Sequence, residues 1–177
     1  MKLVILDRDG VINRESDAYI KTPEEWIPIP GSLAAIGRLN KAGFTVVVAS
    51  NQSGLGRGLF DQQALDAIHA RMQAELAKAG GRLDGIYYCP HKPEDHCDCR
   101  KPKTGLFQQI AAHYRVNMQG VPAIGDSARD LTAAQSAGAR PILVKTGRGL
   151  ETLKQMPDAE VYPDLAAAAD HLLAETR

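Results

Sequence analysis

The sequence predicts an α/β fold in which helices cover both faces of a doubly wound parallel sheet. Short apolar runs rich in β-branched residues alternate with helical patterns along the chain. This alternation is typical of a parallel sheet whose crossover connections are helices. No repeat, low-complexity tract or linker interrupts the pattern, so we expect a single domain over residues 1–177.

Five apolar runs predict the buried strands of this sheet. They are residues 3–6, 44–49, 85–88, 122–125 and 141–144. The helical patterns predict helices near residues 32–42, 62–79, 105–115, 128–138 and 163–175. Asp61 is a favourable N-cap for the second helix, and Gly43, Gly80 and Gly138 follow three of the helices.

The balance of charge argues against nucleic acid or a membrane as the partner. Lysine plus arginine and aspartate plus glutamate each number 21, so the formal net charge is zero, whereas both of those partners attract a basic excess. The first apolar run is too short for a signal peptide, and no segment is long enough to cross a membrane. We therefore expect a cytoplasmic protein, in which thiols stay reduced and clustered cysteines indicate a metal site.

Acidic residues follow two of the predicted strands, at the sheet edge where ligands of such folds bind. Asp7 and Asp9 follow the first strand and, two residues apart on an extended segment, they point the same way. Two such carboxylates repel unless a cation or a proton lies between them. A lone pair of this kind is equally consistent with a solvated acidic turn, but Asp126 ends the fourth strand at the same edge and Asp130 begins the next helix. Together they predict a site for a hard cation such as Mg²⁺.

The second strand is followed by a polar stretch, Ser50-Asn51-Gln52-Ser53, and then by GLGRG. These glycines do not complete GxGxxG, because residue 59 is leucine, so the pattern is weak for a dinucleotide site. Taken alone, the stretch is more typical of a polar loop.

All three cysteines lie in CPHKPEDHCDCRK, residues 89–101. Three thiolates and one imidazole form the closed ligand set of a structural zinc site, and His91 and His96 are the two candidate imidazoles. Reduced buried cysteines are the alternative, although free cysteines are uncommon in a polar, proline-rich loop. Metal ligation would order a loop that has little apolar content, and Arg100 and Lys101 follow its last cysteine directly.

Four segments in order, DRDGVIN, SNQSG, RKPKTG and GDSARD, resemble the four motifs of haloacid dehalogenase (HAD)-type phosphatases. The loop CPHxP…CxCRKP resembles a subgroup that contains heptose-bisphosphate and histidinol-phosphate phosphatases, and DAYIKTPEEWIPIPGS with NQSGLGRGLF is more similar to the heptose branch. The resemblance implies a HAD-like (Rossmannoid) fold without a separate cap domain. It also implies a small phosphorylated sugar as the substrate, with catalytic Mg²⁺ and structural Zn²⁺. We expect the protein to be a monomer.

The resemblance also implies roles for individual residues. Asp7 would be the nucleophile that forms an aspartyl-phosphate, and Asp9 the general acid and base. Mg²⁺ would be held by Asp7, the backbone carbonyl of Asp9, and Asp126, while Ser50 and Lys101 would bind the oxygens of the transferred phosphoryl group. The implied zinc ligands are Cys89, His91, Cys97 and Cys99.

Further residues are expected around the substrate. The candidate substrate contacts are Asn51, Gln52, Ser53, Arg100, Ser127, Asp17 and Tyr19. Asp130 would orient Lys101 or a metal-bound water, and Arg100 would bind the end of the substrate that does not react. Some relatives have lysine where this chain has Ser127, so a phosphate contact there would be weaker. Residues 11–30 and the cysteine loop would shield the site, and His69, His113 and His171 would be ordinary surface or packing residues.

Two other functions fit parts of the pattern. A receiver-like domain phosphorylated on Asp7 would also use an acidic strand end, but a general acid and base at Asp9 would make its phosphoryl group short-lived. An interaction module built on the zinc loop would not need the acidic cluster at all. Histidinol-phosphate phosphatase is the alternative within enzymes, because it would share the whole chemistry.

Overall fold

Six strands form one parallel sheet in the order β3-β2-β1-β4-β5-β6 in the computed structural model, which describes residues 1–177. The strands are β1 Lys2–Leu6, β2 Phe44–Asn51, β3 Gly85–Cys89, β4 Pro122–Gly125, β5 Arg140–Val144 and β6 Val161–Tyr162. On the two sides of β1, Val4 pairs with Val46 and Leu6 pairs with Ile124. The predicted doubly wound parallel sheet is confirmed.

Seven α-helices accompany the strands, six of them between strands and α7 after the last one. They are α1 Ser32–Lys41, α2 Ser53–Gly56, α3 Gln62–Lys78, α4 Gly105–Tyr114, α5 Ala128–Ser136, α6 Gly149–Gln155 and α7 Leu165–Glu175, and two 3₁₀ turns are η1 Pro23–Glu25 and η2 Pro93–Asp95. The five predicted helices are all present. Asp61 caps α3 by accepting a hydrogen bond from the backbone N–H of Ala64 at 2.8 Å. None of the helices is long and apolar enough to cross a membrane.

Besides the two 3₁₀ turns, three elements of the structure were not predicted, namely α2, α6 and β6. They have four, seven and two residues, which is too short for an apolar period to appear in the sequence. β6 still extends the sheet, with Tyr162 opposite Val144 of β5.

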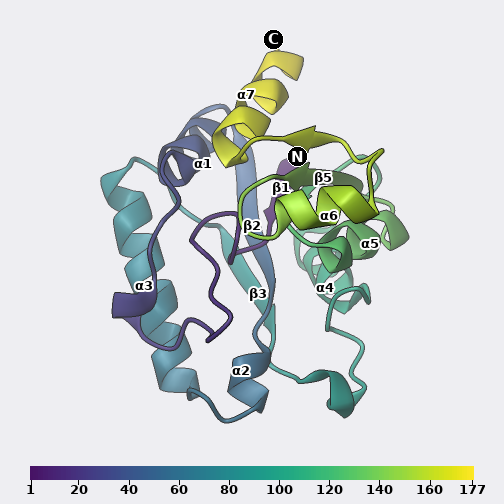
Figure 1. The fold of residues 1–177 in the computed structure, drawn as a ribbon. Coiled ribbons are helices and arrows are strands. Elements are labelled where there is room, and N and C mark those ends of the chain that lie inside the picture. The colour runs from purple at the N-terminus through teal and green to yellow at the C-terminus, as the bar shows by residue number, and fades with distance from the viewer.

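Each face of the sheet has its own apolar core, because successive side chains of a strand point to opposite faces. In β1, Val4 and Leu6 belong to a cluster of 23 buried residues, whereas Leu3 and Ile5 belong to a second cluster of 13. Helices α1, α3 and α7 pack on the larger cluster, and α4 and α5 pack on the smaller one (Figure 1). The two layers of helices leave the ends of the strands for ligands.

The order of the strands changes direction between β1 and β4, and this switch point positions the site. A crevice forms beyond the carboxyl ends of the two strands at such a point. Asp7 follows β1 directly, and Asp126 follows β4. No cap domain stands over this edge. Instead, it is bordered by residues 11–30, which contain only η1, and by residues 89–101, in which η2 follows the end of β3.

Candidate active site

Asp7 and Asp9 both line a cavity at the end of β1, while Arg8 between them is fully buried. The chain turns sharply after them, because the carbonyl oxygen of Arg8 accepts hydrogen bonds from the backbone N–H groups of Ile12 and Asn13, at 2.9 and 3.3 Å. The predicted orientation, with two carboxylates toward one site and Arg8 away from it, is what the structure contains.

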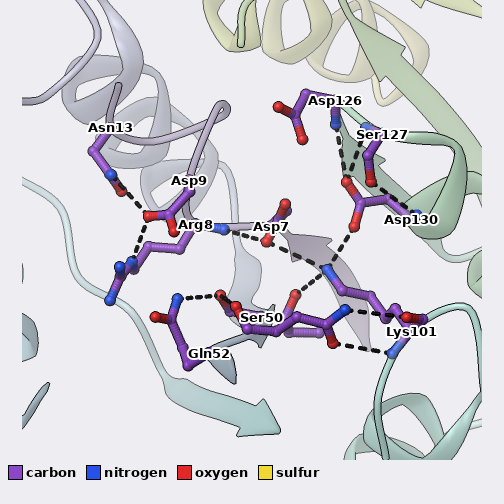
Figure 2. A network of polar contacts seen from close by, with 12 residues as sticks. Asp7, Arg8, Asp9, Asn13, Ser50, Gln52, Lys101, Asp126, Ser127 and Asp130 are labelled. Carbon is purple, nitrogen blue, oxygen red and sulfur yellow. Dashed lines mark hydrogen bonds and ion pairs between the residues drawn. The ribbon is translucent and has the colours of Figure 1, made fainter. Parts of the chain in front are cut away.

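The carboxylate of Asp9 is anchored through one of its oxygens. Oδ1 accepts hydrogen bonds from Arg8 Nε at 2.8 Å and from Asn13 Nδ2 at 2.9 Å (Figure 2). Burial raises the pKa of Asp9, but the charge of Arg8 and these two hydrogen bonds outweigh burial and hold the pKa below its ordinary value. The side chain remains 31% exposed toward the cavity.

Lys101 lies at the floor of the cavity with its ammonium group fully engaged. Nζ donates to the carbonyl oxygen of Ala49 at 2.7 Å, and it lies 2.6 Å from Asp130 Oδ1 and 3.3 Å from Asp7 Oδ1 (Figure 2). Burial lowers the pKa of Lys101, but Asp130 and Asp7 outweigh burial and raise it. The lysine is therefore a fixed positive charge directly beside Asp7.

Asp130 is held at the start of α5 by a reciprocal cap. Its backbone N–H donates to Ser127 Oγ at 3.3 Å, and its Oδ2 accepts from the backbone N–H groups of Ser127 and Asp126, both at 3.1 Å. The other oxygen faces Lys101. With both oxygens engaged, Asp130 has the contacts expected of a residue that orients Lys101.

Three carboxylates, those of Asp7, Asp126 and Asp130, have oxygens within 4.8 Å of one another. Burial and the neighbouring charge of Asp130 raise the pKa of Asp126 to about 7, and the same two causes raise the pKa of Asp7 well above its ordinary value. Crowded, buried oxygen donors of this kind suit a hard cation that cancels their repulsion. The donor set therefore fits Mg²⁺.

Two glycines fix the position of Asp126. A Cβ atom at Gly10 would lie 2.0 Å from Asp126 Oδ2, and one at Gly147 would lie 2.3 Å from the same oxygen. Both glycines have positive φ, +87° and +57°, a conformation that disfavours other residues. The backbone at these two positions approaches Asp126 more closely than a side chain would allow.

Ser50 is the one predicted phosphate-binding residue that does not line the cavity. It is 1% exposed, and its Oγ accepts a hydrogen bond from Gln52 Nε2 at 2.8 Å. Gln52 does line the cavity, and its hydrogen bond to the hydroxyl is drawn in Figure 2. Because Oγ accepts from Gln52, the hydroxyl can still donate its own proton to a phosphate, but this contact would require Ser50 to become accessible from the cavity.

Asn51 differs from its predicted role as a substrate contact. Its Nδ2 donates to the carbonyl oxygen of Lys101 at 3.1 Å, and its Oδ1 accepts from the backbone N–H of Lys101 at 3.0 Å. The amide of Asn51 is thus paired with the backbone of Lys101. Asn51 borders the cavity, but its hydrogen-bonding groups serve the lysine.

The cavity has a volume of about 420 Å³ and is lined mainly by polar residues. The other predicted substrate contacts, Gln52, Ser53, Arg100, Ser127, Asp17 and Tyr19, all line it. Arg57 and Arg129, which were not predicted, join Arg100 there. Burial and the charges of Arg129 and Arg57 lower the pKa of Arg100, so three guanidinium groups share one region of the wall.

Arg148 was also not predicted, although it joins two walls of the cavity. Its backbone N–H donates to Asp126 Oδ2 at 3.0 Å, and its guanidinium reaches Glu15 Oε2 at 2.7 Å and Asp17 Oδ1 at 3.4 Å. These contacts tie the segment 11–30 to the metal candidate site. Arg148 lies shortly after β5, so inspecting the end of that strand as well would have identified it.

The three cysteines come together as predicted, but His91 does not join them. The Sγ atoms are 2.6 Å apart for Cys89–Cys99, 3.5 Å for Cys89–Cys97 and 3.7 Å for Cys97–Cys99. Sulfurs of a tetrahedral zinc site, about 2.3 Å from the ion, lie about 3.8 Å apart, so the cluster fits zinc once the Cys89–Cys99 pair opens to that separation. The His91 imidazole lies outside this group and is 47% exposed, with Nδ1 at 3.8 Å from Asp95. His91 can become the fourth ligand only if its side chain turns toward the sulfurs.

Of the three histidines expected at the surface or in packing, His69 packs in the interior and also has a polar partner. This histidine is buried, on α3, and its Nε2 lies 3.1 Å from Nη1 of Arg8. No local sequence signal pointed to this contact, because the partners are 61 residues apart. His113 packs against the ring of Tyr114 at 4.7 Å, and His171 pairs with Glu175 at 2.9 Å.

Comparison with known proteins agrees with this geometry. A family model described as HAD-hydrolase-like matches residues 98–168. The chain is 57% identical to the D-glycero-β-D-manno-heptose-1,7-bisphosphate 7-phosphatase of Bordetella bronchiseptica over 99% of both chains, and 54% identical to that of Pseudomonas aeruginosa over 97% of both. It belongs to this phosphatase family.

Solved structures of the heptose-bisphosphate phosphatase family have the same fold. The crystal structure of the B. bronchiseptica phosphatase, complexed with magnesium and phosphate, matches with a TM-score of 0.97 over 99% of both chains. That of the Burkholderia thailandensis phosphatase, 42% identical, matches with a TM-score of 0.78 over 98% of this chain and 99% of that one. The HAD-like fold and the phosphatase class predicted from the four motifs are confirmed.

Proposed function

We propose that this protein removes the 7-phosphate of D-glycero-D-manno-heptose 1,7-bisphosphate in a Mg²⁺-dependent reaction. The observation that carries the proposal is that one cavity contains two separate groups of positively charged side chains. Lys101 lies beside Asp7 at the floor, and Arg57, Arg100 and Arg129 lie together on the wall. A substrate with two phosphates can place one at each location, and the named activity of the relatives supports the same substrate.

Asp7, Asp126 and the backbone carbonyl of Asp9 would hold the magnesium ion, whose charge offsets the repulsion between these carboxylates and a phosphate dianion. The magnesium and phosphate in the neighbouring crystal structure support this assignment. Lys101 would add a second positive charge on the reacting phosphate, and its longest contact, 3.3 Å to Asp7, is the one it can most easily exchange for a phosphate oxygen.

The reaction would proceed in two displacements on phosphorus. An oxygen of Asp7 attacks the 7-phosphate in line, a new O–P bond forms, and the bond between phosphorus and the C7 oxygen breaks. Asp9, whose pKa is held low in the free protein, must first take up a proton, and it then gives this proton to the departing oxygen. Asp9 then takes a proton from water as the water attacks the aspartyl-phosphate, which releases inorganic phosphate and restores Asp7.

The second phosphate, on C1, would be bound by the arginines of the wall. Arg100 is half-buried and lines the cavity, and its guanidinium forms no ion pair with a carboxylate of the protein. A guanidinium in this state can bind a phosphate oxygen without first breaking another contact. Ser127, Gln52, Ser53, Asp17 and Tyr19 would contact the sugar between the two phosphates. Zn²⁺ on the cysteine cluster would be structural.

The wider setting follows from the same substrate. The product, a heptose 1-phosphate, belongs to the synthesis of ADP-heptose for the lipopolysaccharide core, a cytoplasmic process in which a monomer would suffice.

A comparison of substrates tests the proposal. We expect kcat/KM with the heptose bisphosphate to exceed that with histidinol phosphate and with p-nitrophenyl phosphate by more than about 100-fold, because only the first reaches the arginines. Activity should be lost when magnesium is omitted; a strong chelator should be avoided, because it would also remove zinc. Equal or better turnover of histidinol phosphate would instead assign the chain to that reaction, and a stable phosphoprotein without turnover would favour the receiver-like alternative.

A further inference from the structure

Beneath the site, Arg8 and His69 form a buried pair that the reaction above does not use. The side chain of Arg8 is 0% exposed, and His69 of α3 is 8% exposed. Neither residue lines the cavity, so neither can touch the substrate. Arg8 Nε donates to Asp9 Oδ1 at 2.8 Å, and Arg8 Nη1 lies 3.1 Å from His69 Nε2. A continuous chain of contacts therefore runs from α3 to Asp9.

The chemistry of the pair sets the direction of its hydrogen bond. A guanidinium has only donors, so His69 Nε2 must accept, and the proton of the neutral ring is then on Nδ1. Burial and the charge of Arg8 lower the pKa of His69 to about 4, which keeps the ring neutral near pH 7. The histidine is thus a fixed acceptor that holds one arm of the guanidinium.

Stability alone does not account for this arrangement. A buried guanidinium is costly unless all of its donors are satisfied, and apolar residues of similar size are often at least as stable in such places. Here Nη2 of Arg8 has no hydrogen-bond partner. The feature that the pair does secure is the orientation of Asp9, whose Oδ1 is anchored by Arg8 and by Asn13 Nδ2. With Oδ1 engaged, the carboxylate has Oδ2 left for proton exchange with the leaving oxygen (Figure 2).

We propose that Arg8 and His69 are positioning residues that hold the carboxylate of Asp9 in place for proton transfer to the leaving group. This inference rests on the proposed function, because it assumes that Asp9 is the general acid and base. It assigns a role to two residues that lie outside the cavity, one of them on a helix that packs against the sheet.

A pair of substrates distinguishes positioning from a general loss of structure. A sugar hydroxyl is a poor leaving group that needs a proton from Asp9, whereas p-nitrophenolate leaves without one. Because kcat/KM reports the steps up to the first phosphoryl transfer, a displaced Asp9 should lower kcat/KM for the sugar bisphosphate only. It should lower kcat for both substrates, since both pass through the same aspartyl-phosphate.

The test uses His69→Met, which removes the acceptor, and His69→Gln, whose amide oxygen can replace Nε2. We expect His69→Met to lower kcat/KM for the bisphosphate about 10–100-fold, part of the 10²–10⁴-fold that a general acid supplies, and His69→Gln to restore most of it. For p-nitrophenyl phosphate, kcat/KM should change less than about threefold in either variant. Arg8→Met should show the same pattern as His69→Met, with a larger loss.

Two control variants make the outcome of this test decisive. Ile68→Val alters a fully buried side chain next to His69 on the same helix, and it should leave the ratio of the two kcat/KM values unchanged. Asp9→Asn should show the strongest form of the pattern; if it does not, the proposed general acid is wrong. If Asp9→Asn shows the pattern and His69→Met lowers both kcat/KM values equally, or neither, the positioning role is wrong while the proposed function stands.

Discussion

At the scale of single residues, Lys101 is held in position both at its ammonium group and at its backbone. Its ammonium contacts Ala49, Asp130 and Asp7, and its backbone forms two hydrogen bonds with the side-chain amide of Asn51. A charge that must meet a phosphate in the transition state is most effective when it needs no rearrangement. In the proposed reaction, Asn51, at the end of β2, would therefore act through Lys101.

Asn51→Leu should lower kcat/KM about 10–100-fold, because it removes two hydrogen bonds worth about 0.5–1.5 kcal/mol each. Asn51→Asp can still accept from the Lys101 N–H but cannot donate to the Lys101 carbonyl oxygen. Its kcat/KM should therefore lie between that of the wild type and that of Asn51→Leu. Steady-state kinetics together with the zinc content of each variant checks this. Wild-type activity in Asn51→Leu would mean that the cysteine loop holds Lys101 without help.

Arg100 is predicted to bind the substrate phosphate that does not react. Arg100→Ala should cost about 10–100-fold in kcat/KM for the heptose bisphosphate, the equivalent of about 1.5–3 kcal/mol for a charge-assisted hydrogen bond. The loss for p-nitrophenyl phosphate should be much smaller. Arg115→Ala, at the C-cap of α4 and outside the cavity lining, is the matched control. Equal losses on both substrates for Arg100→Ala would place this arginine at the reacting phosphate.

At the scale of secondary-structure elements, the loop between β3 and α4 links the candidate zinc site to the catalytic floor. Cys89 ends β3, Cys99 follows ten residues later, and Lys101 lies two residues beyond it. Between them lies only the short η2, and apart from the cysteines the loop contributes no residue to the apolar cores. Without apolar burial, a metal ion is the simplest source of order for such a loop.

Purified protein should contain about one zinc ion per chain, as expected for a single closed ligand set. Cys97→Ser and Cys99→Ser should lower the zinc content and the activity together, and added magnesium should not restore the activity. Elemental analysis of His91→Ala and His96→Ala identifies the fourth ligand, with the loss expected for His91. Full activity in protein shown to be free of zinc would contradict the role of the loop in holding Lys101.

At the scale of the whole molecule, the features that follow from local pattern were predictable and those that depend on packing were not. The apolar runs predict β1 to β5, and the rule that ligands bind at strand ends is enough to group Asp7, Asp126 and Asp130 from their places in the sequence. β6 could not be predicted from the sequence, because a strand of two residues shows no hydrophobic periodicity. The contact between Arg8 and His69 could not be predicted either, because α3 meets the end of β1 only through tertiary packing.

The same distinction applies to the candidate site. Spacing in the sequence brings the three cysteines together, but it cannot decide which imidazole completes the set, because that depends on a side-chain rotation. Likewise, Asn51 and Ser50 lie in the predicted polar stretch, yet their amide and hydroxyl groups are engaged with Lys101 and Gln52. Sequence indicates which residues border the site, whereas hydrogen-bond partners determine which of them are free to bind a ligand.

The central claim is that Asp7 removes the 7-phosphate of a heptose 1,7-bisphosphate. ³¹P NMR of the reaction tests it most directly, because the phosphate on C7 couples to two protons and that on C1 to one. We predict that the C7 signal is replaced by inorganic phosphate while the C1 signal persists, and that Asp7→Asn abolishes the conversion without loss of the fold. Release of the C1 phosphate first, or conversion by Asp7→Asn at a rate near that of the wild type, would contradict the account.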